Sequence, residues 1–186
     1  MLWLLCIFFV SFNGEAQEYV IRYQSLTSGS VFHVETIDGE RIGKVIREQQ
    51  NENVDYTLFG KEEQILASAK TVRYKADTIV TLIDPKGEDI GWFAAQIYNL
   101  YPTEYKVYAS QNRLVAKGFM NWLGNSFALT DPNNPKAYLV TFLRPRFKLF
   151  NDNWHFQVHT EGAIDFRILC VIGTFQTACD LKFEQL

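Results

Sequence analysis

Few residues in this chain have the types and spacing that enzyme chemistry or metal binding requires. His155 and His159 would share one face of a helix at the spacing of metal ligands. However, Trp154, Phe156 and Val158 point one way in an alternating pattern that predicts a strand, on which positions four apart lie about 13 Å from each other. The two imidazoles of such a strand cannot bind one metal ion.

Other catalytic patterns are absent from the sequence as well. It has no Gly-x-Ser-x-Gly elbow, phosphate-binding glycine-rich loop, Cys-x-x-Cys pair or His-Glu-x-x-His motif. The adjacent carboxylates of Glu62-Glu63 and Glu88-Asp89 face different ways on a strand or turn, as solvated side chains do. An active site built from residues distant in sequence stays open, because spacing does not exclude it. We expect a non-enzymatic protein without a cofactor or metal.

Two groups of basic residues could instead bind phosphate groups. They consist of Arg144, Arg146 and Lys148, and of Lys70, Arg73 and Lys75. If residues 143–149 form a strand, the first group places three cations on one face, with about 7 Å between neighbours. Solvated outer faces and protected edge strands give the same pattern, so both interpretations remain open.

Two aromatic segments lie between predicted strands and could contact a partner. These are residues 121–123, with Trp122 at the centre, and residues 98–101. Exposed aromatic side chains are typical of protein interfaces and of membrane interfaces. The interpretation that we favour is that Trp122 caps one end of the fold. Exposure of both segments on one side would favour docking to a protein or a membrane.

The N-terminal residues 1–16 have the character of a signal peptide. Residues 2–10 form an apolar run, and Gly14 and Ala16 supply the small residues that precede a cleavage site after Ala16. No Lys or Arg precedes the apolar run, so a eukaryotic signal, a mis-assigned start and a buried first strand all remain open. Cleavage would leave residues 17–186 as a mature domain in a secreted or other exported compartment.

Length and charge restrict the class of protein further. The chain has 186 residues and a net charge of −3, with 47% hydrophobic residues. This length suits one domain with one core. A general nucleic-acid binder is usually clearly basic, so we expect no nucleic-acid partner. Cys170 and Cys179 lie nine residues apart in a predicted helix, about 13 Å along its axis, which is too far for a disulfide.

Most of the chain is a series of predicted β-hairpins. Segments 31–37 and 41–47 flank an Asp-Gly turn, and segments 78–83 and 89–97 flank Asp84-Pro85-Lys86-Gly87. In each pair an Ile-Gly dipeptide, at 42–43 or 90–91, opens the returning strand, where glycine often marks a bulge or a tight bend. Tyr138, Val140 and Phe142 alternate with their neighbours and are expected to share the buried face. Counting all segments predicts about ten to twelve strands.

Residues 164–179 form the last segment and are apolar on nearly every side. A helix without a polar face must be buried, and Asp165, Arg167 and Gln176 argue against insertion in a bilayer. The segment is also short for a transmembrane span. We therefore predict a mainly β protein, a closed antiparallel barrel around a buried C-terminal hydrophobic helix.

These features resemble the Tubby C-terminal-like, LURP-one-related and phospholipid scramblase superfamily. The resemblance rests on the hairpins with Asp-Gly turns, on Trp154-x-Phe156-x-Val158, and on the Asp165-x-Arg167-Ile168-Leu169 helix with Asp180 at its end. It implies a twelve-stranded barrel around a hydrophobic C-terminal helix. The chain lacks the Pro-rich region, cysteine cluster and acidic calcium loop of the scramblase branch, which argues against scramblase activity.

The resemblance implies binding rather than catalysis. Tubby-type domains bind phosphoinositide headgroups through basic residues on the barrel surface, and the two basic groups could do the same here. The expected partner is an anionic phospholipid or a membrane surface, without a transmembrane span in the mature chain. A protein-interaction module that uses the aromatic loops is the alternative.

Overall fold

The computed structural model describes residues 16–26, 29–50, 53–98, 101–144 and 153–183. In these ranges the chain forms twelve strands, one short 3-10 helix and one α-helix. The strands are β1 (Gln17–Leu26), β2 (Gly29–Thr36), β3 (Arg41–Gln50), β4 (Asn53–Gly60), β5 (Ile65–Tyr74), β6 (Asp77–Ile83), β7 (Asp89–Tyr98), β8 (Tyr101–Ala109), β9 (Arg113–Met120), β10 (Ser126–Asp131), β11 (Asn134–Leu143) and β12 (Trp154–Val158). The helices are η1 (Ser110–Asn112) and α1 (Phe166–Phe183).

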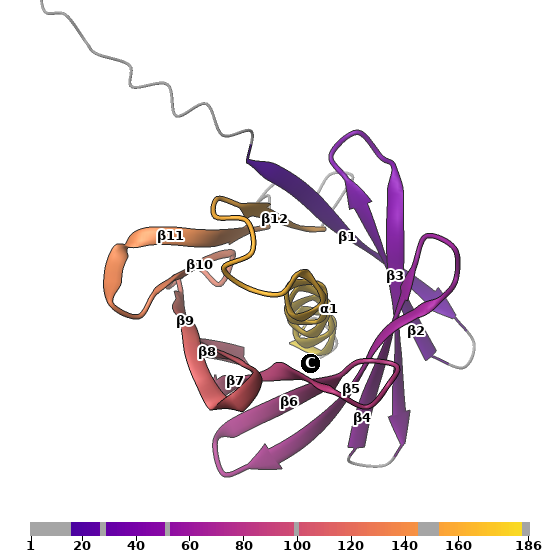
Figure 1. Cartoon of the computed structure of the whole chain (residues 1–186), viewed down its shortest axis with the longest axis horizontal. Coiled ribbons are helices and arrows are strands. Elements are labelled where there is room, and N and C mark those ends of the chain that lie inside the picture. The colour runs from indigo at the N-terminus through magenta and orange to yellow at the C-terminus, as the bar shows by residue number, and fades with distance from the viewer. Residues whose placement is uncertain (1–15, 27–28, 51–52, 99–100, 145–152, 184–186) are drawn as a thin grey trace, which may run out of the picture.

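The strands form one closed barrel in which sequence neighbours are also neighbours in space. Each strand pairs antiparallel with the next, and β1 pairs with β12 to close the ring. Viewed along the barrel, the strands surround α1 (Figure 1). The predicted closed antiparallel barrel around a C-terminal helix is confirmed. Within the described ranges, no helix has the length and apolar character that crossing a bilayer requires.

The core lies between the inner face of the barrel and α1. In β4 every second residue is buried, as expected for a strand with one face against a core. Large aromatic side chains from the strands, including Phe93, Phe142 and Trp154, belong to the same buried cluster as Ile168 and Ile172 of α1, and all five are almost inaccessible. Gly173 lets α1 approach β1 closely, because a Cβ there would lie 2.9 Å from Cγ1 of Ile21.

The helix begins two residues later than predicted and extends further. Asp165 caps it, because its Oδ1 accepts a hydrogen bond from the backbone N–H of Arg167 at 2.9 Å. An aspartate in this position satisfies a helix N–H that has no partner within the helix. From Ile168 to Ala178 every residue is buried, which confirms the predicted burial of this segment.

Both Ile-Gly dipeptides lie at bulges, as predicted. The register shifts between Val34 and Glu35 opposite the first dipeptide, and between Leu82 and Ile83 opposite the second. Gly91 has a φ of 141°, and a Cβ there would overlap the carbonyl oxygen of Tyr108. Glycine is therefore required at this position both by backbone conformation and by space.

The prediction for β11 is wrong at one residue. Val140 and Phe142 are buried as expected, but Tyr138 is 58% exposed. The β10–β11 register shifts so that Leu129 pairs with Val140 while Thr130 pairs with Tyr138. One extra residue in β11 reverses the faces before Val140, which simple alternation does not reveal.

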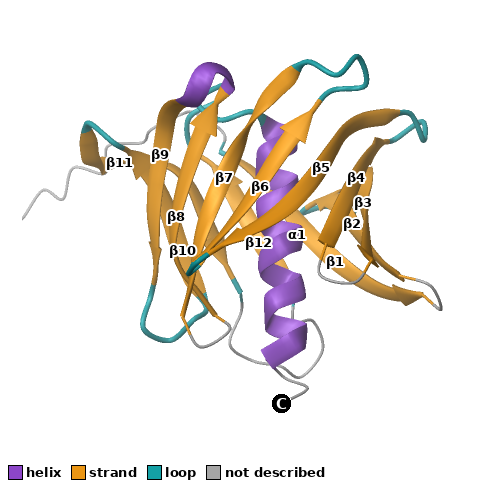
Figure 2. Ribbon diagram, turned by 90° about the horizontal axis from the view of Figure 1, so that it is seen from below, coloured by secondary structure: helices purple, strands orange, loops and turns teal. Residues whose placement is uncertain are grey.

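The two ends of the barrel carry different turns. We call the end at which α1 begins the N-end and the end at which it finishes the C-end. Because every strand reverses direction, the β5–β6 and β9–β10 turns lie at the C-end, whereas the β2–β3, β4–β5 and β6–β7 turns lie at the N-end. Figure 2 shows α1 running between the two ends, with the loop after β9 at the C-end.

Candidate functional site

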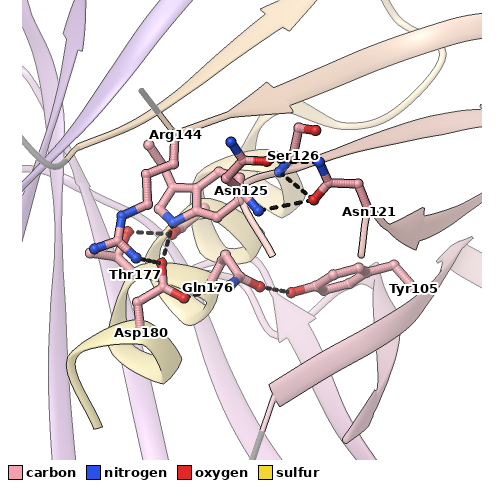
Figure 3. Close-up of polar contacts among 10 residues, drawn as sticks. Tyr105, Asn121, Asn125, Ser126, Arg144, Gln176, Thr177 and Asp180 are labelled. Carbon is pink, nitrogen blue, oxygen red and sulfur yellow. Dashed lines mark hydrogen bonds and ion pairs between the residues drawn. The ribbon is translucent and has the colours of Figure 1, made fainter. Parts of the chain in front are cut away.

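A buried polar network fixes the last turns of α1 at the C-end. Asp180, 4% exposed, accepts the indole N–H of Trp154 at 2.6 Å and the amide of Gln176 at 2.9 Å. The hydroxyl of Tyr105 donates to Oε1 of Gln176 at 2.5 Å. Nη1 of Arg144 lies 2.9 Å from Oδ2 of Asp180 and completes an ion pair (Figure 3). The network joins the helix to β8, β12 and the end of β11.

This network changes the interpretation of Arg144. A strand over 143–149 would place three cations on one face, but β11 ends at Leu143, and the Arg144 side chain is only 15% exposed. A buried guanidinium is stable where a carboxylate compensates its charge, and Asp180 does so. Arg144 therefore contributes no cation to the surface. Arg146 and Lys148 lie outside the described residues.

The same network holds the loop between β9 and β10. Oδ1 of Asn121 accepts hydrogen bonds from the backbone N–H groups of Asn125 and Ser126, at 3.0 and 3.2 Å. Its amide donates to Oδ1 of Asn125 at 2.7 Å. The backbone N–H of Arg144 donates to the carbonyl of Asn125 at 2.8 Å. The loop is thus tied by its own hydrogen bonds and, through Arg144, to α1 (Figure 3).

At its tip the loop presents Trp122, which is 91% exposed. The prediction that Trp122 caps the barrel is wrong, because a capping side chain would be covered and this one is almost fully exposed. Leu123 beside it is exposed as well, as are Phe119 near the end of β9 and Leu143 at the end of β11. The C-end therefore carries exposed apolar side chains on this loop and near the ends of β9 and β11. The side chains of the other aromatic segment, 98–101, lie outside the described ones.

The second basic group is divided by the strand geometry. Lys70 lies within β5 opposite Asp55, whereas Arg73 is an odd number of positions away and so points to the other face. Lys75 lies in the β5–β6 turn with a φ of 56°, and its Nζ is 5.2 Å from the centre of the Tyr74 ring. All three lysine and arginine side chains are exposed. Of these three residues, Arg73 and Lys75 lie at the tip of the C-end, and Lys70 does not.

The histidines and cysteines have structural environments. Nδ1 of His155 lies 3.3 Å from Oε1 of Glu18, and Nε2 of His159 lies 3.0 Å from the hydroxyl of Thr141. Among the described residues, no three His, Cys, Asp or Glu side chains gather as metal ligands do. Cys170 is a buried free thiol. Burial raises the pKa of the Cys170 thiol far above its usual value, so it stays protonated and unreactive.

Comparisons with known proteins find a similar fold but no family. No family model matches the chain, and no curated protein matches it. Among solved structures, the X-ray structure of a protein from Arabidopsis thaliana superimposes with a TM-score of 0.58 at 12% identity. The match covers 89% of this chain and 91% of that chain. At such low identity the likeness shows the fold alone.

Proposed function

We propose that the protein is a non-enzymatic binding protein that docks with the C-end of its barrel on membranes containing anionic phospholipids. We further propose that it belongs to the Tubby C-terminal-like, LURP-one-related and phospholipid scramblase superfamily. The barrel around a C-terminal helix, and a structural likeness that spans most of both chains, support this membership.

The exposed indole of Trp122 is the observation on which the docking proposal depends. Tryptophan prefers the boundary between lipid and water, where its ring is apolar and its N–H can still find a partner. Trp122 and Leu123 project from a loop that Asn121 and Arg144 already hold in place. A preformed loop loses little conformational entropy when it binds. The C-end can therefore insert two apolar side chains at a low ordering cost.

The distribution of charge favours the same orientation. Arg73 and Lys75 lie at the C-end, and a basic residue near an anionic surface contributes about 1 kcal/mol of binding. In contrast, three of the N-end turns, at 37–40, 61–64 and 84–88, hold six carboxylates and two lysines. An anionic membrane repels that end. The barrel is thus oriented with its C-end toward the lipid.

Flotation with vesicles tests this proposal. We expect the mature chain to float with vesicles of phosphatidylserine and phosphatidylcholine, and much less with phosphatidylcholine alone. Arg73→Glu combined with Lys75→Glu should weaken binding at least tenfold, since each reversal removes about 1 kcal/mol or more. Raising the salt concentration should weaken binding of the wild-type chain in the same direction, because salt screens exposed charges.

Matched variants at the opposite end serve as controls. Trp122→Ala should reduce flotation strongly, whereas Ile37→Ala, which removes an exposed apolar side chain at the N-end, should leave it unchanged. Lys86→Glu is the equivalent control for charge. Equal flotation of Trp122→Ala and wild type would refute the docking mode. Absence of flotation at low salt would refute lipid binding and leave the protein-partner alternative for Trp122.

The predicted export of the chain lies outside the described residues, because residues 1–15 are not described. We propose that it is secreted after cleavage following Ala16. Expression of the full-length chain in a eukaryotic secretory host should release a product that begins at Gln17. N-terminal sequencing of the medium and cell fractions measures this. An uncleaved product that stays in the cytosol would contradict the signal-peptide interpretation.

A further inference from the structure

A cavity of about 590 Å³ opens at the N-end of the barrel, opposite the proposed docking surface. The ends of β7, β8 and β9 form one side of it, and the 159–165 connection with the first turn of α1 forms the other. The mouth of a barrel is a frequent ligand site, and this volume lies within the range of about 300–1,000 Å³ that is usual for small molecules. Figure 2 shows η1 at this end of the barrel, which is also the end at which α1 begins.

The deeper wall of the cavity is apolar. Ile90 and Ile168 are buried residues of the core whose side chains line it, and Val115 and Phe166 are partly accessible from it. An apolar group of a ligand would therefore replace water against these side chains, which is favourable.

Two of the charged groups at the cavity already compensate each other. Nε and Nη2 of Arg167 donate to the two carboxylate oxygens of Asp165 at 3.0 and 2.7 Å. Burial raises the pKa of Asp165, but these hydrogen bonds outweigh it and hold the pKa below its usual value. Asp165 also caps α1, so the first helix N–H groups do not form an anion site.

The other two charged groups at the cavity are uncompensated. Among the described residues, neither the guanidinium of Arg113 nor the carboxylate of Glu161 takes part in a hydrogen bond or an ion pair. One lies at the start of β9 and the other in the 159–165 connection, on opposite sides of the opening. The cavity therefore combines an apolar wall with one free cation and one free anion.

We infer that the N-end cavity binds a small zwitterion with an apolar side chain, the chemistry of a hydrophobic amino acid or its dipeptide. Arg113 binds the ligand carboxylate with two parallel N–H groups, a geometry that suits carboxylates. Glu161 accepts the ligand ammonium group, and the side chain of the ligand packs on Ile90 and Val115. The inference does not depend on membrane docking, which concerns the other end of the barrel.

Calorimetric titration of the mature chain with blocked and unblocked probes tests this inference. The probes are L-phenylalanine, leucyl-phenylalanine, N-acetyl-L-phenylalanine and L-phenylalanine amide. Loss of one charge-assisted contact should weaken binding at least about tenfold, so each blocked derivative should bind that much more weakly than L-phenylalanine.

Two variants assign the contacts to residues. Arg113→Gln should bind L-phenylalanine and its amide equally, since the carboxylate partner is gone. Glu161→Gln should bind L-phenylalanine and its N-acetyl derivative equally. Both side chains are exposed, so thermal unfolding should stay unchanged and show that the variants fold. Lys136→Gln, an exposed N-end cation that does not line the cavity, should bind like wild type.

Three results would overturn the inference. The first is that neither zwitterion gives a heat of binding at millimolar concentration. The second is that the wild-type chain binds all four probes with equal affinity. The third is that both variants prefer the same probes as the wild-type chain.

Discussion

Removal of the Asp180 carboxylate should destabilise the barrel more than any loss of surface charge. In Asp180→Ala, the indole N–H of Trp154 and the amide of Gln176 each lose an acceptor, at 2.6 and 2.9 Å. The guanidinium of Arg144, only 15% exposed, loses the carboxylate that compensates it. The variant leaves a cation and two neutral donors without these partners.

The cost can be estimated from these contacts. Removal of one partner of a buried ion pair costs about 3–5 kcal/mol, because the remaining charge is uncompensated. Whole domains of this kind are stable by about 5–15 kcal/mol, so the change is a large fraction of the total. For a chain of this length we expect the Tm to fall by about 6–20 °C. Arg144→Ala should cost less, because Trp154 and Gln176 still solvate the carboxylate.

Urea unfolding of the wild-type chain, both single variants and the double variant measures the coupling. The double variant should be at least about 2 kcal/mol more stable than the sum of the single effects predicts, because it leaves no uncompensated charge. A control is Lys61→Ala, which removes a fully exposed ion pair with Glu40 and should change stability little. Single effects below about 1 kcal/mol, with no coupling, would show that water compensates both charges and would refute the reasoning.

Three further predictions concern the framework of the barrel. Gly91→Ala should lower the free energy of unfolding by well over the roughly 1–2 kcal/mol that a left-handed backbone conformation costs, because the new Cβ would also overlap a carbonyl of β8. Gly39→Ala should show this conformational cost alone, because Gly39 has a φ of +86° and open space around it. Equal effects of the two substitutions in chemical denaturation would contradict the steric argument. Asp165→Ala should cost about 1–2 kcal/mol as a lost helix cap. The pKa of Asp165 in the folded chain lies below its usual 3.8. The carboxylate therefore contributes its full stabilisation above pH 3.8, and this stabilisation declines as the pH falls below 3.8. The stabilities of the wild-type chain and the variant should converge in acid unfolding curves. Burial, and then the Arg41 charge, lowers the pKa of His33 below 6.5, so the fold favours the neutral side chain. The contribution of His33 to the free energy of unfolding is therefore complete above pH 6.5 and declines as the pH falls through 6.5 toward the folded pKa. An NMR titration that gives His33 a pKa above 6.5 would contradict this prediction.

The fold could be predicted well from the sequence because the dominant signals are local or follow from burial. Asp-Gly turns and alternating segments identify hairpins, and hairpins in series pair with their sequence neighbours. An apolar helix of about 16 residues has to be covered, and only the sheet could cover it. The exception is Tyr138, whose face depends on a bulge in β11. A bulge without glycine leaves no local signal.

The candidate site was much less predictable, because its contacts join distant segments. Arg144 alternates with other cations in sequence, which indicates a surface strand, yet its partner Asp180 lies in the helix. The sequence around Trp122 is compatible with a cap, which we favoured, and with an exposed tip. The contacts that decide between these, from Asn121 to the next backbone N–H groups, depend on the loop conformation. The one available signal was the pair Gln176 and Asp180, four residues apart in an apolar helix.

This polar pair explains how an almost wholly apolar helix acquires one orientation in the barrel. Apolar packing alone is tolerant, because many rotations of such a helix bury a similar area. Gln176 and Asp180 lie on one face, four positions apart, and meet donors from Tyr105 and Trp154. Rotation by one residue, about 100°, would move both side chains away from these donors and leave buried polar groups unsatisfied. The network thus selects one rotation of α1, and through Arg144 the same choice fixes the loop that presents Trp122.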